Sequence, residues 1–390
     1  MKFKGFRRKN GQVGIRNNYL IIGVCDALDG IVNGIARKYE NVLTVTSEHG
    51  CPAAGNEQVI NNLAGLADNP NIVGVIIMGM GCEGVRPEMV KEAMTVDKPV
   101  KIIKVTEIGG TVKAIEQGRK TIEDMMKSEN FQRELVDVSE ITLGVKCGGS
   151  DTTSGIAGNT CAGYAVDKLI DNGGTAIFTE PIECIGGEES LISRAINKKV
   201  ADDLRKTIAI EQKRWTIPGV NMEFMCYGNI RGGLSTIEEK SLGAIHKSGS
   251  RPIQGVLKYN NNFLEKPSKK GLYLQDGTML FSHCITHLAA AGCQMLLFVT
   301  GVGASVLSQL MPTIKICGNS TSYNNLIDDM DINAGNFIDG KETIKEIGDK
   351  IFNKMIKVAE GEKTKLEGIG YSGFAIYKKD SRLEHFLNKR

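Results

Sequence analysis

The sequence predicts an α/β protein built on mostly parallel sheets. In its first third, short apolar runs alternate with segments of helical periodicity, which is the pattern of βαβ units. The runs are almost entirely apolar, as expected of strands that are covered on both faces. Glycine is abundant, with 46 residues, and proline is scarce, with 9, so many glycine turns between regular elements are expected.

The first part of the chain opens with a basic segment and continues as four strand–helix pairs. The predicted strands are Tyr19–Cys25, Val42–Ser47, Val73–Gly79 and Pro99–Glu107, and the predicted helices are Leu28–Tyr39, Asn56–Asp68, Pro87–Met94 and Thr111–Ser128. The polar segment Lys127–Glu140 then interrupts the pattern. Because domain boundaries fall in such polar stretches, we expect one domain over residues 1–135 and a second over 136–390.

The second part restarts the same alternation. The predicted strands are Ile141–Lys146, Thr175–Thr179, Ile253–Leu257, Met295–Thr300 and Thr313–Ile316. Helices are expected after Ser154, along Glu189–Gln212, from Ser235, near Ala289 and along Lys341–Glu360, and Lys258–Gly271 is expected to be an exposed excursion. Ser235 and Glu238 match a capping box at the start of their helix.

Composition and charge exclude several classes of protein. The 390 residues are 41% apolar and 24% charged, with a net charge of +3 and no basic or acidic block, which favours neither nucleic acid nor a membrane surface. The most apolar stretch, Met295–Leu307, is shorter than the ~20 residues of a membrane helix, and the N-terminus has no secretory signal. We therefore expect a cytoplasmic protein, whose ten cysteines are not a disulfide framework.

Four predicted strands run directly into a cysteine beside glycine: Cys51, Cys82, Cys147 and Cys317. Ligands bind at this edge of an open α/β sheet, and a following helix N-terminus lowers the pKa of a thiol toward thiolate, the form that binds soft metals. The alternative is that each cysteine is a small buried residue that closes a turn, and for any single one this is favoured. The absence of a C-x-x-C pair argues against a structural zinc ribbon.

Charged residues near strand ends are the other candidates. Glu180 and Glu183 flank Pro181 just after a strand, where carboxylates ligate hard metals or act as bases. Arg16 can hold a substrate carboxylate through a bidentate pair. Lys240 follows a glycine-rich loop, and its default environment is solvent. Neither a G-x-G-x-x-G after the first strand nor a G-x-x-x-x-G-K-[ST] occurs, which makes nucleotide binding a weak alternative.

Several long segments, in order, resemble the altronate/galactarate dehydratase family of sugar-acid lyases. They span residues 5–340 and include GFRRKNGQVGIRNN, EHGCPAAGNEQ, LGVKCGGSDTTSGIAGN, TEPIECIGGEE and GNIRGGLSTIEEKSLGAIHKSG. The large subunit of sulfolactate sulfo-lyase shares this architecture; DTTSG and GNI-x-GGL-x-TIEEK resemble that branch, whereas EHGC, CGNS and DDMDINAG resemble the sugar-acid branch. Asp276–Met279 departs from a D-x-P-G-like stretch of the dehydratases, so the resemblance leaves the substrate open.

The resemblance implies β-elimination of water from a sugar acid such as altronate or galactarate, which gives a keto-deoxy acid. It implies an α/β fold of two Rossmann-like parallel-sheet domains, the second an elaborated variant that carries the metal. The first domain is expected to dimerise and to form part of the active-site rim. The chain begins at the large-domain motif, so a separate small β-rich partner subunit is expected, in a homodimer or hetero-oligomer.

The same resemblance, with the chemistry of elimination, nominates the site. The cofactor is expected to be a divalent metal, Fe²⁺, with Mn²⁺ or an iron–sulfur cluster on cysteines as alternatives. The metal candidates are Cys147, Cys317, Cys51, Cys82 and Glu183. Lys240, Glu180 and His49 are nominated for proton transfer, and Arg16, Ser150, Asp151, Asn229 and Asn319 for binding or orienting the substrate. The competing hypotheses are the sulfo-lyase large subunit and a non-catalytic ligand-binding subunit.

Overall fold

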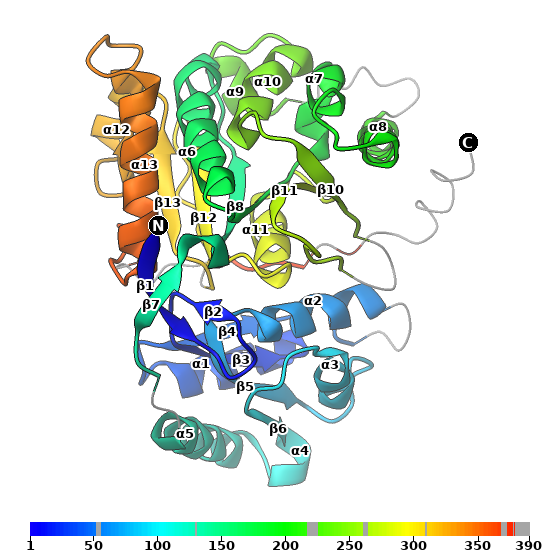
Figure 1. Cartoon of the computed structure of the whole chain (residues 1–390). Coiled ribbons are helices and arrows are strands. Elements are labelled where there is room, and N and C mark those ends of the chain that lie inside the picture. Colours follow the sequence, from blue (N-terminus) through cyan, green and yellow to red (C-terminus); the bar gives the residue numbers. More distant parts are fainter. Residues whose placement is uncertain are drawn as a thin grey trace.

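The computed structural model describes residues 1–51, 56–128, 131–216, 225–259, 264–308, 310–367, 373–376 and 378. These residues form a mixed α/β structure with two parallel sheets, one in each half of Figure 1. The class that the sequence predicts, α/β with parallel sheets, is therefore confirmed. Among the described residues, no helix is both long and apolar enough to cross a membrane; the cytoplasmic location stays a prediction.

The larger sheet has seven parallel strands in the order β10-β11-β9-β8-β12-β13-β14. Their bounds are β8 Thr142–Cys147, β9 Thr175–Phe178, β10 Ile253–Leu257, β11 Gly271–Gln275, β12 Met295–Thr300, β13 Thr313–Cys317 and β14 Ile332–Asn333. The chain reverses direction across the sheet from β8, with β9 on one side and β12 on the other. In an open α/β sheet, such a switch point is where side chains of adjacent strand ends form a site.

Helices cover both faces of this sheet, and alternate side chains of β12 show how. Leu297 and Val299 belong to the core shared with helices α6 and α13, whereas Leu296 and Phe298 belong to the core that includes α11. Figure 1 shows α6 and α13 side by side on the outer face, with α11 toward the smaller sheet. The bounds of these helices are α6 Thr160–Asp171, α11 Phe281–Ala290 and α13 Ile344–Ala359.

The smaller sheet has four parallel strands in the order β4-β3-β5-β6. The strands are β3 Asn18–Gly23, β4 Val42–Thr46, β5 Ile72–Gly79 and β6 Val100–Lys104, and the helices are α1 Asp29–Ala36, α2 Glu57–Asp68, α3 Pro87–Ala93, α4 Val105–Ile108 and α5 Thr111–Ser128. All eight residues of β5 are buried, as its uninterrupted apolar run predicts. The strand predicted over Pro99–Glu107 ends at Lys104, because the helix α4 begins at Val105.

A third, antiparallel sheet was not predicted. It consists of β2 (Val13–Gly14), β1 (Lys2–Arg7) and β7 (Glu134–Asp137). These strands are short and partly exposed, so they lack a long apolar run that would reveal them. The boundary expected between residues 135 and 136 falls inside β7, which pairs with the N-terminal strand, and the two-domain division remains a prediction.

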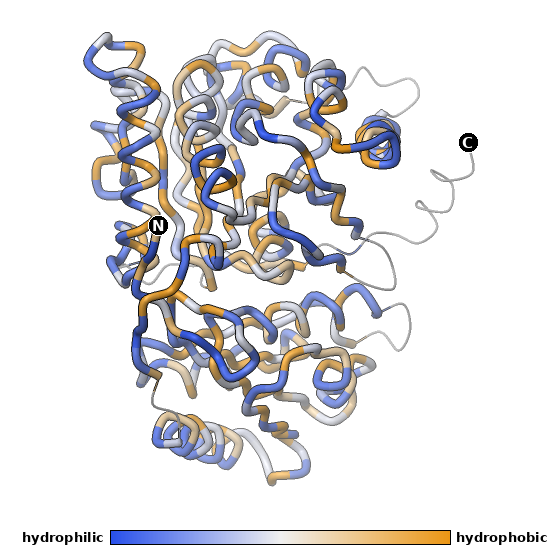
Figure 2. The backbone as a smooth tube through the Cα atoms, viewed as in Figure 1, coloured by the Kyte–Doolittle hydropathy of each residue, from blue (hydrophilic) through white to orange (hydrophobic). Residues whose placement is uncertain are grey.

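Two further expectations need correction. The predicted helix Glu189–Gln212 is two helices, α7 (Glu188–Ile192) and α8 (Lys198–Trp215), because Ala195 between them pairs with Ile253 at the edge of β10. Strand β11 was not predicted; it begins at Gly271, the last residue of the expected excursion, in which residues 260–263 lie outside the described part of the chain. Figure 2 shows that α8 and α13 carry both hydrophilic and hydrophobic residues, as helices on a surface do.

The two parallel sheets are joined through α2 and α11, which pack closely where Gly65 meets Ala290. A Cβ atom on Gly65 would lie 2.7 Å from the carbonyl oxygen of Ala290, so a side chain there would force the helices apart. Asparagines next to α2 complete the junction. The Asn71 amide donates to the carbonyl oxygens of Gln294 and Leu310, both at 2.8 Å, and its Oδ1 accepts from the backbone of Ile15 at 2.9 Å.

We expect Asn71→Ala to lower the free energy of unfolding by about 3 kcal/mol, because it leaves three buried backbone groups without a partner. Urea unfolding followed by circular dichroism measures this change. Asn324→Ala, on the exposed surface of the helix Ser320–Asn325, is the matched control. A loss for Asn71→Ala no greater than that of the control would contradict a structural role of this junction.

Candidate active site

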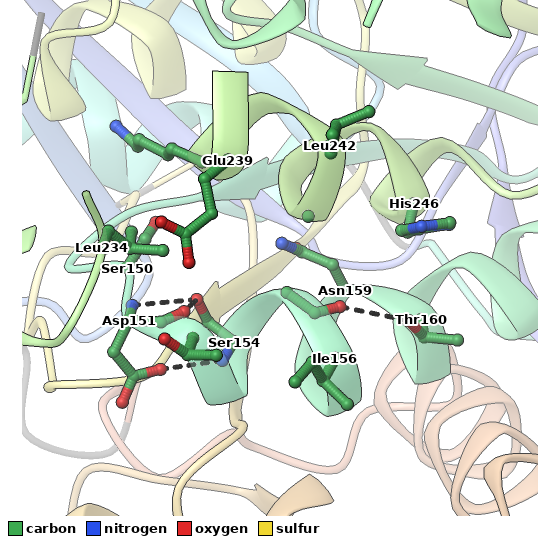
Figure 3. A pocket seen from close by; sticks show the side chains of 14 residues that line it. Ser150, Asp151, Ser154, Ile156, Asn159, Thr160, Leu234, Glu239, Leu242 and His246 are labelled. Atoms are coloured by element: carbon green, nitrogen blue, oxygen red, sulfur yellow. Dashed lines mark hydrogen bonds between the residues drawn. The ribbon is translucent and has the colours of Figure 1, made fainter. Parts of the chain in front are cut away.

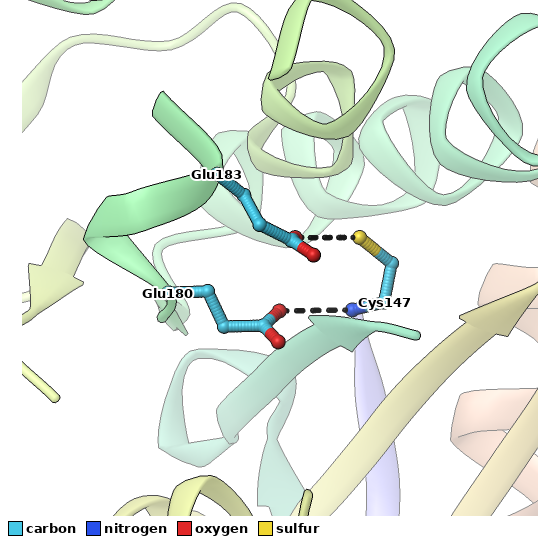
Figure 4. A group of neighbouring side chains, drawn as sticks. All are labelled: Cys147, Glu180 and Glu183. Atoms are coloured by element: carbon cyan, nitrogen blue, oxygen red, sulfur yellow. Dashed lines mark hydrogen bonds between the residues drawn. The ribbon is translucent and has the colours of Figure 1, made fainter. Parts of the chain in front are cut away.

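The ends of β8 and β9 bring the first members of the site together. The two strands are parallel neighbours, with Val145 opposite Phe178, so Lys146 and Cys147 lie beside the residues that follow β9. One of these is Glu180, whose Oε2 lies 3.4 Å from the backbone nitrogen of Cys147. The short helix η4 (Pro181–Cys184) then carries Glu183 to the same place. Figure 4 shows Glu180 and Glu183 pointing toward Cys147.

Glu180 reaches this position through an unusual backbone. Its φ of 75° is the single positive value among the non-glycine residues that the structure describes. An L-residue in the left-handed region is strained, and such residues cluster at functional sites. Here the conformation turns the chain sharply after β9, so that the Glu180 carboxylate points back at the strand ends instead of continuing away from the sheet.

Lysines from a separate part of the chain complete the group. The helix α10 (Ile237–Ala244) carries Lys240, and the following helix η5 (Ile245–Ser248) carries Lys247. Close packing of α10 against η4 requires glycine at residue 186: its φ is +83°, and a Cβ there would lie 2.5 Å from Cγ of Glu238. The helix begins one residue later than predicted, because Thr236, not Ser235, accepts from the backbone of Glu239.

The charged groups form a connected network, which we call the Lys–Glu cluster: Lys146, Glu180, Glu183, Lys240 and Lys247. Each carboxylate oxygen pairs with an ammonium group, and Lys247 pairs with one oxygen of each glutamate. Glu180 Oε1 pairs with Lys146 and its Oε2 lies 3.2 Å from Lys247 Nζ. Glu183 Oε1 lies 3.0 Å from Lys240 Nζ and its Oε2 lies 2.7 Å from Lys247 Nζ. Three ammonium groups and two carboxylates leave an excess of positive charge, which suits an anionic ligand.

The cluster is deeply buried, which makes its charge pairs strong. Lys146 is fully buried, with Nζ 4.5 Å from the centre of the Phe281 ring and 2.9 Å from the carbonyl oxygen of Cys147. The side chain of Lys240 is 10% exposed, against 2% for Lys247 and 0% for Lys146, so it is the most accessible of the three lysines. The default expectation of a solvated Lys240 was wrong, because Glu183 draws it inward.

The two glutamates are held at different pKa values. Although burial favours the neutral acid, the ammonium groups of Lys240, Lys247 and Lys146 hold the pKa of Glu183 well below its usual range. Burial and the neighbouring Glu183 charge raise the pKa of Glu180. Such a separation between paired carboxyl groups is typical of acid–base sites. Burial opposes the charge of Lys240, but Glu183 prevails and raises the pKa of this lysine, which is protonated at neutral pH.

The Cys147 thiol is not a thiolate in this environment, contrary to the expectation from its place at a strand end. Burial and the Glu183 carboxylate raise its pKa to about 12, and its Sγ lies 3.0 Å from Glu183 Oε2, to which it donates. Burial likewise raises the pKa of Cys317 to about 11. Desolvation exceeds the effect of a helix N-terminus at both cysteines.

Alkylation tests the state of these thiols. At pH 8, a pKa of about 12 leaves roughly one Cys147 in ten thousand as thiolate. We therefore expect iodoacetamide to label the exposed residues Cys51, Cys82 and Cys226 while sparing Cys147, as read by peptide mass spectrometry. All ten cysteines should label after unfolding in urea. Labelling of Cys147 in the folded protein at the rate of Cys226 would show a reactive, accessible thiolate instead.

The candidate metal ligands do not converge as expected. In the described part of the chain, one group of three ligand residues has donor atoms within 4.8 Å of one another, and it consists of Cys147, Glu180 and Glu183. Cys317 ends β13, two strands and about 10 Å from β8, with β12 between them. Cys51 and Cys82 follow β4 and β5 of the smaller sheet.

All four of these cysteines are described, and no three of their sulfur atoms meet that spacing. In this arrangement Cys51 and Cys82 belong to the smaller sheet, and β12 separates the strands that end at Cys147 and Cys317 in the larger one.

The group of Cys147, Glu180 and Glu183 could hold a metal ion by the kind and spacing of its donors. In this arrangement, however, the Lys247 ammonium already contacts all three, at 3.2 Å from the sulfur and at 3.2 and 2.7 Å from the two carboxylates. A divalent ion and this ammonium cannot occupy the same position. The donors as arranged therefore do not fit a divalent metal, and no chemical step below depends on one.

A cavity of about 620 Å³ opens onto the cluster. Glu180, Glu183 and Lys240 line one part of it, together with Asn229 and His283. The remaining lining residues are Gly148, Gly149, Trp215, Met225, Cys226, Met279, Leu280, Phe281, Ser282, Val306 and Ala375. A small polar acid fits such a cavity, which combines apolar walls with a few convergent charged groups.

A second hollow of about 470 Å³ meets the first at Lys240, which lines both. Ser150, Asp151 and Asn159 line it, with Glu239 and His246 from α10 and η5 on the opposite side (Figure 3). The side-chain oxygens Oγ of Ser150 and Oδ1 of Asn159 are buried there without a hydrogen-bond partner. Buried polar atoms are normally satisfied, so two unpaired ones beside this hollow make it a candidate site for a ligand that carries hydroxyl groups.

Four of the five residues nominated for substrate binding lie together. Asn229 donates to the carbonyl oxygen of Ser150 at 2.9 Å, and Asn319 donates to Asp151 Oδ2 at 3.3 Å. Asp151 also accepts from the backbone of Ser154 at 2.8 Å, at the start of the π-helix η3 (Ser154–Asn159) that leads into α6. Asp151 and Asn319 thus shape the turns at the rim of the sheet.

Arg16 and His49 lie elsewhere. The Arg16 guanidinium pairs with Glu367 at 2.7 Å and donates to the carbonyl oxygens of Val358 and Glu362, so protein groups take the place of a substrate carboxylate. His49 follows β4 of the smaller sheet, with Nε2 3.3 Å from the carbonyl oxygen of Ile376. It interacts electrostatically with His283 of the cavity but does not contact the Lys–Glu cluster.

Sequence reasoning missed Lys146 and Lys247. A signal for Lys146 existed: it is a lysine at the end of an otherwise apolar strand, ITLGVK, immediately before a nominated cysteine. A charged side chain in a buried parallel strand is tolerated only if a group of opposite charge or a hydrogen-bond partner lies next to it. Lys247, in the segment GAIHKSG, carried no comparable signal, since a lysine at the end of a helix is ordinarily solvated.

Comparisons with known proteins agree with one another. Residues 5–130 match the model of the D-galactarate dehydratase/altronate hydrolase second domain, and residues 138–381 match that of the D-galactarate/altronate dehydratase C-terminal region. The chain is 33% identical to the altronate dehydratase of Bacillus subtilis, over 96% of this chain and 77% of that protein. It is 31% identical to the (2R)-sulfolactate sulfo-lyase subunit beta of Chromohalobacter salexigens, over 96% of each chain.

A third relative, the galactarate dehydratase (L-threo-forming) of Escherichia coli, is 31% identical over 93% of this chain and 73% of its own length. The similarity to each of the three thus covers both parallel sheets.

Proposed function

Because the chain belongs to the D-galactarate/altronate dehydratase family of lyases, we propose that it eliminates water from a sugar acid such as altronate or galactarate. The product is a keto-deoxy acid. One observation carries the proposal: a buried cluster with excess positive charge opens onto a cavity large enough for a small polyhydroxy acid. Charge of this kind attracts the substrate carboxylate and stabilises the enediolate that forms when the neighbouring proton is removed.

The pKa shifts of the cluster residues suggest which residue acts as the base and which as the acid. Glu180, whose pKa is raised, takes the proton from the carbon beside the carboxylate. Lys240 is protonated and borders both hollows, so it donates a proton to the departing hydroxyl, which leaves as water. Lys146, Lys247 and Glu183 fix the positions of these two groups. The enol that remains converts to the keto-deoxy acid.

The second hollow extends the substrate site. Ser150 and Asn159 offer unpaired polar atoms to the hydroxyl groups of a longer acid, and Asn229 and Asp151 hold the Ser150 turn in place. The contribution of residues 1–135 to the rim stays a prediction, because His283 lines the cavity and His49 does not. Asn319 supports the turn at Asp151, whereas Arg16 lies outside both hollows, and its binding of the substrate stays a prediction. A direct role of His49 in proton transfer stays a prediction, as does a ferrous or manganous ion.

The second candidate is the large subunit of a (2R)-sulfolactate sulfo-lyase. The relative from Chromohalobacter salexigens, which is named as a subunit beta, favours it, because the two chains match over 96% of each. The name of this relative supports the proposal of a second subunit; that the partner is small and β-rich stays a prediction. In the sulfo-lyase reaction, sulfite leaves in place of water and pyruvate remains.

One assay separates these functions. The anaerobically purified protein, alone and with a small partner subunit, is incubated with altronate, galactarate and sulfolactate, and products are identified by NMR and by a sulfite assay. A keto-deoxy acid from altronate or galactarate supports the dehydratase. Sulfite and pyruvate from sulfolactate would replace it with the sulfo-lyase. Full turnover by a Lys240→Met variant in the partner complex would instead indicate a non-catalytic subunit.

A further inference from the structure

The position of Lys247 within the Lys–Glu cluster has a consequence for metal binding. Its ammonium group has three N–H donors, and the structure provides three acceptors: Cys147 Sγ at 3.2 Å, Glu180 Oε2 at 3.2 Å and Glu183 Oε2 at 2.7 Å. These acceptors belong to the three residues of the possible metal group, Cys147, Glu180 and Glu183. We infer that Lys247 acts as a built-in cation, which excludes divalent metal ions from Cys147, Glu180 and Glu183.

The backbone of Lys247 is fixed, so the ammonium cannot easily withdraw. Lys247 is 2% exposed. The next residue, Ser248, is fully buried and is held by Arg194, which donates to its hydroxyl at 3.0 Å and to its carbonyl oxygen at 3.2 Å. The hydroxyl in turn donates to the carbonyl oxygen of Ile245 at 2.7 Å, which closes the helix η5.

The charges explain why an ion would bind if Lys247 were absent. With Lys247 present and the thiol neutral, three lysines and two glutamates give a net charge of +1. Without it, a divalent ion with the Cys147 thiolate, Lys146, Lys240 and the two glutamates gives the same total. An uncharged residue at position 247 therefore removes one positive charge, which a divalent ion bound to the Cys147 thiolate restores. In the wild type, an ammonium within 3.2 Å of each donor repels the ion.

The inference concerns the site of the proposed function but does not depend on its reaction. Cobalt(II) is the probe, because binding to a cysteine thiolate gives a sulfur-to-cobalt charge-transfer absorption. The full-length protein is titrated with Co²⁺ anaerobically as the wild type and as Lys247→Met. We expect no charge-transfer band in the wild type and a clear band in Lys247→Met. The affinity of Lys247→Met for Co²⁺ should be at least about 100-fold higher than that of the wild type.

Two control variants locate the ion. Lys247→Met/Cys147→Ser should lose the band, since it lacks the sulfur ligand. Lys240→Met removes a lysine that contacts Glu183 Oε1 but leaves Lys247 in place, so it should stay without the band.

A stoichiometric band in the wild-type protein that is lost in Cys147→Ser would overturn the inference, and this arm holds even if Lys247→Met does not fold. That result would leave the proposed elimination intact, because the readout is metal binding. Absence of turnover on all three acids would conversely leave the inference on Lys247 untouched.

Discussion

Replacing Glu183 by glutamine is expected to lower the rate of elimination by about 10²–10⁴-fold. Glu183 contacts three groups of the site: Lys240 at 3.0 Å, Lys247 at 2.7 Å and the Cys147 thiol at 3.0 Å. An amide of the same size keeps the shape of the side chain but removes the charge that holds both ammonium groups in place. Lys240 then loses the contact that orients it as the proposed acid.

The loss should fall on kcat more than on KM. The positive charge that attracts the substrate carboxylate increases in Glu183→Gln, whereas the orientation of Lys240 and the balance between the two glutamates are lost. Steady-state kinetics on the accepted substrate measure both constants. Glu189→Gln, on the adjacent helix α7 with its carboxylate 81% exposed, is the matched control and should retain wild-type kinetics. A kcat for Glu183→Gln within threefold of the control would remove Glu183 from the mechanism.

The second large effect is on stability. We expect Lys146→Met to lower the free energy of unfolding by about 3–5 kcal/mol, because it leaves the buried Glu180 carboxylate short of a partner. Removing both charges together costs less than removing one, so the double variant Lys146→Met/Glu180→Gln should recover part of this loss. Urea unfolding of the wild type, both single variants and the double variant gives the coupling energy.

Lys345→Met is the control for this series. Its lysine is 73% exposed and pairs with Asp349 at 3.1 Å on the surface of α13, where an ion pair contributes less than about 1 kcal/mol. A loss for Lys146→Met that is as small as that of the control would mean that Glu180 is neutral in the folded protein, which would also weaken its assignment as the base.

The parallel strands of both sheets could be predicted because their signal is local. Strands such as β5 and β12 are uninterrupted apolar runs bounded by glycine or polar residues, and burial on both faces requires that composition. Strand β11 and the antiparallel β1–β7 pair were missed, since their signal is weak: β7 exposes most of its residues, and β11 follows a polar excursion. The break between α7 and α8 depends on Ala195 pairing with Ile253, which no local pattern reveals.

The sequence by itself determined that Glu180, Glu183 and Cys147 lie at or just after strand ends, because the glycine and polar residues that follow an apolar run mark the end of the strand. Only the tertiary structure decided what surrounds them. Lys240 and Lys247 come from a helical segment more than fifty residues after Glu183, and they meet the glutamates because α10 packs on η4 at Gly186.

The same holds for the cysteines, which share a local pattern but are held apart by the fold: Cys51 and Cys82 lie in the smaller sheet, and β12 separates Cys147 from Cys317 in the larger one. Charge and distance in a folded site are properties of packing between elements, and periodicity within one element carries no information about them.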